Sequence, residues 1–272
     1  MVSLVTGASS GLGRDIAKLL CKKSHTVYVV ARRKDKLLEL QKECSKEPGK
    51  IKIIEGDLTD IKFRIKLINQ ILKESNKIDY LINNAGYGKL EQLERIEFKD
   101  IEGMIQLNVT ALQHLTQLVL PSMKQKKSGK IINISSIAAF EPQAYFATYN
   151  STKFAVHGFT RSLKYELKNT GVSTSVVFPP RMNTSFWVVA FKCKRLSDAK
   201  QKNCIEEWNK KSTGSLAVAK YIVKNLNSKR LLILPGSFTK IAYYILRHFK
   251  FIGTMFVNTT GINKAKKVLE IK

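Results

Sequence analysis

Short apolar runs alternate with longer amphipathic segments along most of this chain of 272 residues. The runs are rich in Val and Ile and have few polar positions, as in strands of a parallel sheet that is covered on both faces. The segments between them carry apolar residues at helical spacing. Strands joined through helices make right-handed crossovers. The alternation therefore predicts an α/β fold, a Rossmann-type doubly wound parallel sheet of about seven strands with helices on both faces.

These patterns define the expected elements and the domain organisation. Strands are predicted at Val2–Thr6, Thr26–Ala31, Ile51–Glu55, Asp79–Ile82, Lys130–Ile134, Val172–Phe178 and Arg230–Leu234. Helices are predicted at Leu12–Lys23, Lys34–Cys44, Ile61–Glu74, Ile101–Lys124, Asn150–Lys168 and Ser215–Asn227. No linker or internal repeat divides the chain, so we expect one catalytic domain over residues 1–236. Within it, residues 182–212 break the alternation and are expected to form a substrate-binding insertion. Residues 237–272 form a basic, amphipathic C-terminal tail of the same domain.

The chain is strongly basic, with 47 Lys and Arg against 21 Asp and Glu and a formal net charge of +26. Such a charge attracts nucleic acid, anionic membranes or acidic ligands. The basic residues are spread along the whole chain, which favours ordinary solvated helix faces. No nucleic-acid-binding motif accompanies the charge, so we expect no nucleic-acid partner.

Cysteine usage and apolar stretches bear on the cellular location. The four cysteines form no C-x-x-C pair and have no metal-ligand spacing, which predicts reduced thiols, no metal site and a cytoplasmic protein. They are Cys21, Cys44, Cys193 and Cys204. The first strand already starts at Val2, so we expect no cleaved signal peptide. The apolar stretch 241–257 is interrupted by Arg247, His248 and Lys250, which makes it a poor transmembrane span.

A glycine-rich turn, Thr6-Gly7-Ala8-Ser9-Ser10-Gly11-Leu12-Gly13, lies between the first strand and the first helix. Glycines allow a tight turn and close backbone approach, and a helix N-terminus binds the pyrophosphate of a dinucleotide. An ordinary strand–helix connection is the alternative, but the position directly after the first strand is the context that dinucleotide binding requires. The turn resembles the T-G-x-x-x-G-x-G fingerprint of the short-chain dehydrogenase/reductase family.

The residues after the second strand bear on the choice of dinucleotide. An acidic residue there binds the ribose 2′-hydroxyl of NAD, whereas a basic residue accommodates the 2′-phosphate of NADP. This chain has Ala31-Arg32-Arg33 and no carboxylate. Arginine binds phosphate bidentately, so Arg32 predicts NADP(H) as the cofactor. Two solvated arginines are the alternative, and Ser10 stands where many NADP-binding relatives carry a further basic residue.

Tyr149 and Lys153 stand four residues apart, a spacing that puts both side chains on one face of a helix. A free phenol titrates near ~10, and a neighbouring cation lowers that pKa. The pair is thus a candidate proton donor and acceptor near neutral pH. By itself, the motif is weak, because a chain with nine tyrosines and many lysines can hold an exposed Tyr–Lys pair by accident.

Two further residues make the pair specific. Ser136 stands thirteen residues before Tyr149, at the end of a predicted strand, and Asn108 lies in the preceding predicted helix. All the motifs occur in the family's order, so the chain is identified as a member. The resemblance implies that Tyr149 is the general acid and base, and that Lys153 lowers its pKa and holds the nicotinamide ribose. It also implies that Ser136 orients the substrate oxygen and that Asn108 supports a water that relays protons.

The resemblance also implies a set of cofactor contacts. Asp57 follows the third strand, where the family contacts adenine, and Asn83-Asn84-Ala85-Gly86 matches its N-N-A-G after the fourth. After the sixth strand, the family's usual Pro-Gly is replaced in the stretch Pro179-Pro180-Arg181-Met182-Asn183-Thr184. Because Pro180 has a fixed φ and lacks an N–H, the sequence does not determine the shape of the pocket at this turn. The implied contacts are Gly7, Ser9, Ser10, Gly11, Leu12, Gly13, Arg32, Asp57, Leu58, Asn84, Ala85, Gly86, Tyr149, Lys153, Pro179, Met182 and Thr184.

The expected function is NADP-dependent hydride transfer between nicotinamide and a carbonyl or secondary alcohol, with reduction of a hydrophobic ketone or acyl-type substrate favoured. The stretch Phe186–Phe191 offers an apolar substrate wall, followed by Lys192, Lys194 and Arg195 for an anionic group. A helix that buries its apolar side against the domain is the alternative for this stretch. The alternative for the whole chain is a catalytically silent NADP-binding sensor or scaffold, against which the intact catalytic set argues.

The sequence also bears on self-association and on contact with a membrane. Family members form homodimers or homotetramers through two helices, and Phe154, Gly158, Phe159 and Leu163 are the expected contact positions. In the tail, one apolar stripe is surrounded by positive charge, which suits a peripheral membrane contact. The stripe is Ile241, Tyr244, Ile245, His248, Phe249 and Ile252, and the charges are Lys240, Arg247, Lys250, Lys264, Lys266 and Lys267. A lid over the cleft, an oligomer contact and plain packing are the alternatives for the tail.

Overall fold

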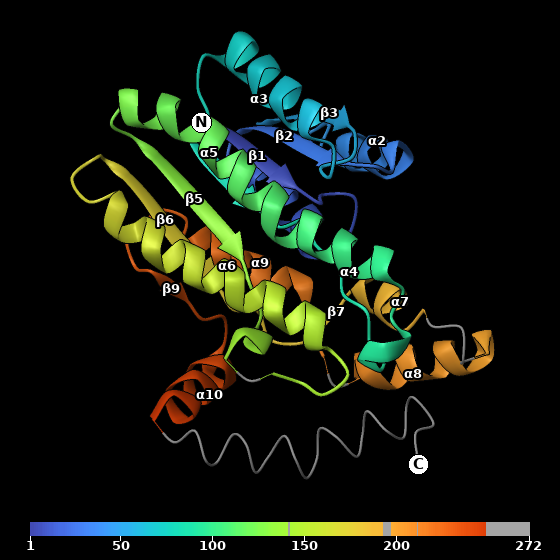
Figure 1. The fold of residues 1–272 in the computed structure, drawn as a ribbon. Helices are drawn as coiled ribbons and strands as arrows, with labels where there is room; N and C mark the ends of the chain where they lie inside the picture. Colours follow the sequence, from blue (N-terminus) through green and yellow to red (C-terminus); the bar gives the residue numbers. More distant parts are fainter. Residues whose placement is uncertain (141, 193–196, 211, 249–272) are drawn as a thin grey trace.

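The computed structural model describes residues 1–140, 142–192, 197–210 and 212–248. Its centre is a seven-stranded sheet in the order β3-β2-β1-β4-β5-β6-β9, in which every pair of neighbouring strands is parallel (Figure 1). The strands are β1 (Val2–Thr6), β2 (Thr26–Ala31), β3 (Lys50–Glu55), β4 (Tyr80–Asn83), β5 (Gly129–Ile134), β6 (Val172–Val177) and β9 (Leu232–Ile233). A separate two-stranded sheet pairs β7 (Met182–Asn183) with β8 (Thr213–Gly214).

Ten α-helices are found in the described residues. They are α1 (Gly11–Lys22), α2 (Lys34–Glu43), α3 (Ile61–Ser75), α4 (Phe98–Ile105), α5 (Leu112–Gln125), α6 (Ala147–Glu166), α7 (Phe186–Ala190), α8 (Asp198–Lys210), α9 (Ser215–Lys224) and α10 (Ser237–His248). Short 3₁₀ turns form η1 (Leu93–Arg95) and η3 (Ile137–Ala139), and a π-helix, η2 (Gln106–Ala111), joins α4 to α5.

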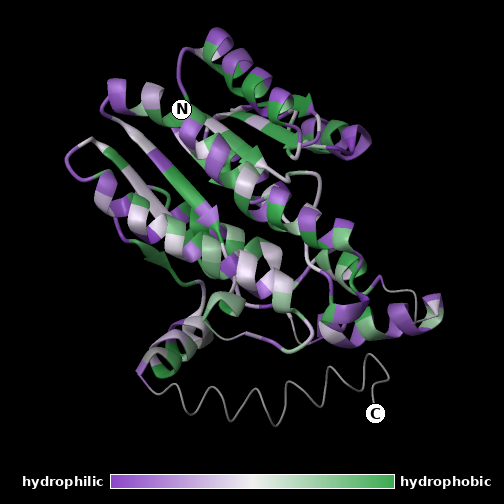
Figure 2. Cartoon of the chain, viewed as in Figure 1, coloured by the Kyte–Doolittle hydropathy of each residue, from purple (hydrophilic) through white to green (hydrophobic). Residues whose placement is uncertain are grey.

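The core lies on both faces of the sheet, because successive strand residues point to opposite sides. In β2, Val27 and Val29 join a cluster with residues of α1, α2 and α9, whereas Tyr28 and Val30 join one with residues of α3, α5 and α6. All four side chains are fully buried. Figure 2 shows hydrophobic and hydrophilic residues alternating along α3 and α5, as expected for helices with one covered side. The predicted doubly wound sheet is confirmed.

The strand order reverses beside β1. This strand pairs with β2 on one side, Val2 opposite Thr26, and with β4 on the other, Ser3 opposite Tyr80. Ligands of open α/β sheets bind at such a reversal, in the crevice outside the carboxyl ends of the strands. The fold therefore indicates one edge of the sheet for a binding site, next to the turns that follow β1 and β4.

Several elements differ from the sequence-based expectation. The single helix predicted at Ile101–Lys124 is α4, η2 and α5 in succession, with the π turn in the middle. The last predicted strand shrinks to the two residues of β9. Residues 182–212, expected only as an insertion, contain α7 and α8. In the described part of the chain, no helix has both the length and the apolarity that a membrane span needs.

Candidate active site

One large cavity, about 2020 Å³ in volume, lies at the carboxyl ends of the strands. A drug-sized ligand needs only ~300–1,000 Å³, so this volume suits a dinucleotide together with a substrate. Most of the predicted site residues line it: Gly7, Ser9, Ser10, Gly11, Leu12, Arg32, Asp57, Leu58, Asn84, Ala85, Gly86, Ser136, Tyr149, Lys153, Pro179, Met182 and Thr184. Gly13 and Asn108 are not among the lining residues.

The glycine-rich turn after β1 packs tightly against the segment after β4. Gly7 has a φ of +67°, and a Cβ there would lie 2.8 Å from the Cα of Ala85. Thr6 Oγ1 accepts hydrogen bonds from the backbone N–H groups of Asn84 and Ala85, each at 3.0 Å. A Cβ at Gly13 would lie 2.6 Å from the carbonyl oxygen of Gly7. Gly13 therefore lets α1 pack against the turn, which explains why it does not face the cavity.

The first turn of α1 fits a phosphate group. The helix begins at Gly11, and its N-cap Ser10 makes no side-chain capping hydrogen bond. The first N–H groups of a helix have no partner within the helix, and an anion at this end is further favoured by the helix dipole. Gly11 also lies on the cavity wall, so a pyrophosphate can approach these N–H groups. The residues present thus fit a dinucleotide.

The structure adds a residue to the predicted cofactor set, Arg33. Its Nη2 donates to the hydroxyls of Ser9 and Ser10, each at 2.8 Å, and its side chain lines the cavity. Arg32, which sequence reasoning selected, lies 3.8 Å from Asp57 Oδ2 with its side chain 74% exposed. Arg33 brings a cation to Ser10, the position where the sequence lacks one. The sequence does indicate this residue, because Arg33 is the second arginine of the pair that follows β2.

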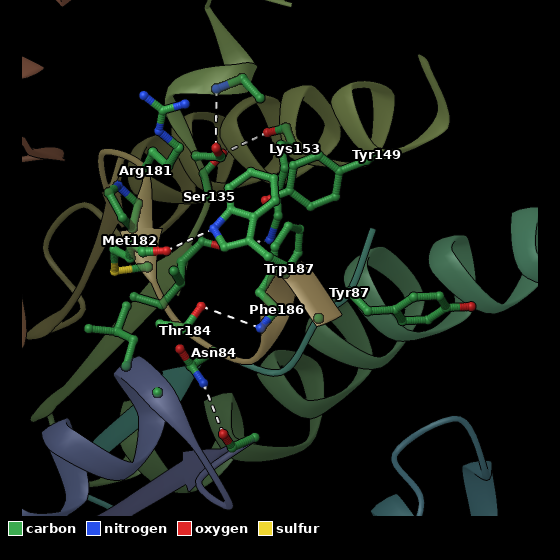
Figure 3. A pocket seen from close by; sticks show the side chains of 18 of the residues that line it. Asn84, Tyr87, Ser135, Tyr149, Lys153, Arg181, Met182, Thr184, Phe186 and Trp187 are labelled. Atoms are coloured by element: carbon green, nitrogen blue, oxygen red, sulfur yellow. Dashed lines mark hydrogen bonds between the residues drawn. The ribbon is translucent and has the colours of Figure 1, made fainter. Parts of the chain in front are cut away.

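Tyr149 and Lys153 both lie on α6 and face the cavity (Figure 3). Lys153 Nζ is 5.5 Å from the centroid of the Tyr149 ring and donates to the carbonyl oxygen of Ile134 at 3.0 Å. Ser136 lies between β5 and η3, and its Oγ accepts a hydrogen bond from the N–H of Ala138 at 3.2 Å. Three of the four predicted catalytic side chains, those of Ser136, Tyr149 and Lys153, therefore meet at the carboxyl end of β5.

The electrostatics of this pair differ from the sequence-based expectation. Burial raises the pKa of Tyr149 to about 12, although a hydrogen bond with Ser136 opposes the rise. Burial likewise lowers the pKa of Lys153 to about 8. The expected lowering of the tyrosine pKa by the lysine is not seen in this state, because desolvation disfavours both charged forms.

Asn108 is 1% exposed and lies in the π turn between α4 and α5. Its Oδ1 accepts from the N–H of Tyr87 at 3.0 Å, and its Nδ2 donates to the carbonyl oxygen of Tyr87 at 2.8 Å. The same Nδ2 donates to Thr152 Oγ1 at 3.1 Å. Asn108 thus joins the segment after Gly86 to α6, the helix that carries Tyr149 and Lys153.

The predicted apolar substrate wall is α7, and its side chains divide between core and cavity. Trp187 is buried, and its ring lies 5.4 Å from that of Trp208 on α8. Phe186, whose ring centroid is 5.3 Å from that of Tyr149, lines the cavity, as do the exposed Val188 and Val189. The stretch thus packs against the domain and also lines the cavity, and its role as a substrate wall stays a prediction. Of the cations that follow, Lys192 is exposed, whereas 194 and 195 lie outside the described residues.

Helix α10 also borders the cavity, which residues from Ser237 to Leu246 line in part. Thr239 and Tyr243 are buried against the domain. Ile241 and Tyr244, on the predicted apolar stripe, are 58% and 57% exposed. Ile241 and Ile245 of this stripe also line the cavity, whereas Tyr244 does not, so the stripe is exposed and borders the cavity on one side. Its members Phe249 and Ile252, and the charges Lys250, Lys264, Lys266 and Lys267, lie outside the described residues.

Comparisons with known proteins agree on one family. A family model described as short chain dehydrogenase matches residues 1–192. A fatty acyl-CoA reductase from Acinetobacter baylyi is 35% identical over 67% of this chain and 63% of its own length. A short-chain dehydrogenase from Sphingobium yanoikuyae in complex with NADPH is 26% identical, with a TM-score of 0.77 over 93% of this chain and 94% of its own. A short chain dehydrogenase/reductase from Burkholderia phymatum in complex with NAD, 21% identical, matches in fold with a TM-score of 0.82 over 92% and 93% of the two chains.

Proposed function

Because the chain belongs to the short-chain dehydrogenase/reductase family of oxidoreductases, we propose that it is an NADP(H)-dependent enzyme that reduces a hydrophobic ketone or acyl-type substrate. The observation that carries this proposal is the meeting of Ser136, Tyr149 and Lys153 in the cavity that the glycine-rich turn also lines. One cavity thus joins a phosphate-binding helix end to a proton donor.

The bound nicotinamide supplies the hydride, and the protein supplies position and electrostatics. Tyr149 donates a proton to the carbonyl oxygen in reduction and accepts it in oxidation. Ser136 donates a hydrogen bond to the same oxygen as negative charge develops there. Lys153 holds the ribose hydroxyls of the nicotinamide nucleotide. In its ammonium form, it also favours the phenolate of Tyr149, and its pKa of about 8 makes that form accessible near neutral pH.

Asn108 acts through its neighbours in this scheme. Its three hydrogen bonds hold Tyr87 and Thr152 in place, and Lys153 directly follows Thr152 on α6. These bonds use both Nδ2 hydrogens and one of the two acceptor positions of Oδ1, so the side-chain amide has little capacity left for a proton-relaying water. We therefore assign the Asn108 side chain a positioning role in the proposed relay.

The NADP preference rests on the two arginines after β2. The 2′-phosphate of NADP is recognised by arginine, and Arg33 and Arg32 both line the cavity beside Ser9 and Ser10. No carboxylate in the segment Ala31–Lys34 opposes it. Proteins of similar structure have been solved with NADPH or with NAD. The preference of this chain is therefore tested by measuring its affinity for each cofactor.

A hydrophobic substrate fits the aromatic and aliphatic residues that α7 contributes to the cavity. Phe186, Trp187, Val188 and Val189 line it together with Leu90 and Phe146 from other segments. The relative described as a fatty acyl-CoA reductase supports an acyl-type substrate. The catalytically silent sensor gains no support from any observation, since the three catalytic side chains are all in place.

An assay of NADPH oxidation tests the proposed function directly. Aliphatic aldehydes, aliphatic ketones, steroid ketones and acyl thioesters form the panel, and Tyr149→Phe is the control variant. Turnover of at least one hydrophobic carbonyl by the wild-type protein, lost in the variant, is expected. NADPH binding without turnover of any of them would favour the silent sensor.

We further propose a cytoplasmic homodimer or homotetramer and a peripheral membrane contact through α10. Phe154 on α6 is 44% exposed, and a Cβ at Gly158 would meet no atom within 4 Å, so this face of α6 has room for a symmetry mate. Leu163, expected as a fourth contact position, is instead buried in the core. The prediction for Leu163 was wrong, because that side of α6 packs on the sheet.

A further inference from the structure

Arg181 is the cavity-lining residue that the proposed chemistry leaves without a role. It follows Pro180 at the position where the family's Pro-Gly turn is altered, and it lies on the loop between β6 and β7. Its backbone is fixed, because its carbonyl oxygen accepts from the N–H of Thr213 at 2.9 Å. Its guanidinium carbon lies 5.1 Å from the centre of the Trp208 ring, so the cation rests on an aromatic face at the wall of the cavity.

Among the described residues, no carboxylate lies within ion-pair distance of Arg181, and its buried Nε has no hydrogen-bond partner. A guanidinium has five N–H donors, and leaving such groups desolvated without an acceptor is costly. The same desolvation lowers the pKa of Arg181. The protein thus places a partly desolvated cation at the cavity without an anion of its own.

The position of Arg181 separates it from the cofactor phosphates. In Figure 3, Arg181 lies at the opposite end of the pocket from Asn84, whose amide donates to the carbonyl oxygen of Thr6 at the glycine-rich turn. Its neighbours are the aromatic residues of the substrate wall, since Trp208 packs against Trp187. The cation therefore belongs to the hydrophobic part of the cavity.

We propose that Arg181 is a specificity-determining residue that binds an anionic oxygen group, a carboxylate or a phosphate, carried by an otherwise hydrophobic substrate. This inference rests on the proposed function and names its substrate class. The planar guanidinium suits such groups because it donates two parallel hydrogen bonds. Trp208 supports it from behind by a cation–π contact, which leaves the edge of the guanidinium for the ligand.

The binding test compares three ten-carbon probes, decanoate, decyl phosphate and decan-1-ol, on the protein saturated with NADP⁺. We expect at least one anionic probe to bind about tenfold or more tightly than the alcohol, a difference of ~1.4 kcal/mol. Arg181→Met keeps the length and apolar body of the side chain and should remove this preference, with alcohol affinity unchanged. Arg181→Lys should retain part of it. Arg230→Met, at the exposed amino end of β9, is the matched control.

Each outcome decides the inference. Tighter binding of decanoate or of decyl phosphate, lost in Arg181→Met, supports it and identifies the group. Equal affinity for anions and alcohol overturns it, as does a preference that survives in Arg181→Met or an absence of binding by all three probes. Thermal unfolding verifies that the variants fold. Turnover of neutral decanal with NADPH tests the proposed function separately, so that an active enzyme without anion preference refutes the role of Arg181 alone.

Discussion

Arg33 Nη2 lies 2.8 Å from Ser10 Oγ, so the second of two adjacent arginines contacts the N-cap of α1, the helix that we propose binds phosphate. Ser10 uses its hydroxyl for this bond and does not cap α1. Both arginines line the cavity, Arg33 next to Ser10 and Arg32 next to Asp57.

The first prediction concerns cofactor affinity. NADPH should bind the wild-type protein at least ~10-fold more tightly than NADH, because we propose that two guanidinium groups bind the 2′-phosphate. Arg33→Leu should lose more NADPH affinity than Arg32→Leu, and Arg32→Asp should favour NADH. Fluorescence titration of both cofactors measures this, with the NADH affinity of the leucine variants as the control. Equal wild-type affinities for the two cofactors would refute the assignment.

A second prediction separates catalysis from binding. Tyr149→Phe should lower kcat by ~10²–10⁴-fold, the usual contribution of a general acid. Its NADPH affinity should stay near that of the wild type, because we expect the phenol to donate a proton and to contribute little to cofactor affinity. Lys153→Ala should lose both turnover and cofactor affinity. Stopped-flow and titration measurements distinguish the two variants, and substantial activity in Tyr149→Phe contradicts the mechanism.

Lys130 gives a prediction about stability and pH. It is 4% exposed, and its Nζ donates to Ser175 Oγ and to the carbonyl oxygen of Ser228. Burial lowers its pKa to about 8, whereas an unfolded lysine titrates near ~10.4. Between these values, the unfolded chain binds more protons, so stability should rise with pH, by roughly 3 kcal/mol in all.

Urea unfolding between pH 8 and 10.5 measures this effect. The free energy of unfolding of the wild type should rise relative to that of Lys130→Met across this window, and the difference should level off below pH 8. Lys229→Met, which removes an exposed lysine nearby, should behave as the wild type does. A parallel pH dependence in Lys130→Met would show that Lys130 is not the group that titrates.

The fourth prediction concerns α10. Its exposed Ile241, Tyr244 and Ile245 should insert into a membrane interface, aided by the positive charge of the chain. The protein should therefore co-sediment with anionic liposomes, and less so as salt rises. Replacing the three residues with Ser should abolish binding, whereas Phe98→Ser, which removes a still more exposed apolar residue on α4, should not. Indifference of the wild type to liposomes at low salt leaves only the lid and packing interpretations.

The sequence predicted the parts of the fold that depend on periodicity and on glycine. The strand Thr26–Ala31 has the bounds that the sequence predicted, because a run that is buried on both faces has few polar positions. The glycine-rich segment was placed correctly at the junction of β1 and α1, and it extends into the first turn of α1. Its conformation depends on missing Cβ atoms, as at Gly7 and Gly11, whose φ angles are positive.

Features that depend on contacts between distant segments were not predictable. Asn108 lies in a π turn, and its side-chain amide donates to the carbonyl oxygen of Tyr87. The apolar periodicity of the sequence does not indicate the extra residue that a π turn contains. The pKa of Tyr149 depends on how deeply α6 is covered, which the spacing to Lys153 does not reveal. Which of Arg32 and Arg33 contacts the glycine-rich turn depends on the direction of each side chain after β2, and the sequence does not give that direction.

The parallel sheet has a consequence for how the chain acquires its structure. Since all pairings in the seven-stranded sheet are parallel, no two neighbours are joined by a hairpin, and each pairing awaits a crossover. β1 gains its second neighbour only when Tyr80–Asn83 has been synthesised, and β6 only when Leu232 has. Folding dominated by such non-local pairing is slow. A nascent chain therefore exposes an unpaired edge of β1 and later of β6 until these partners are synthesised, and its yield in a cell should depend on chaperone capacity and growth temperature.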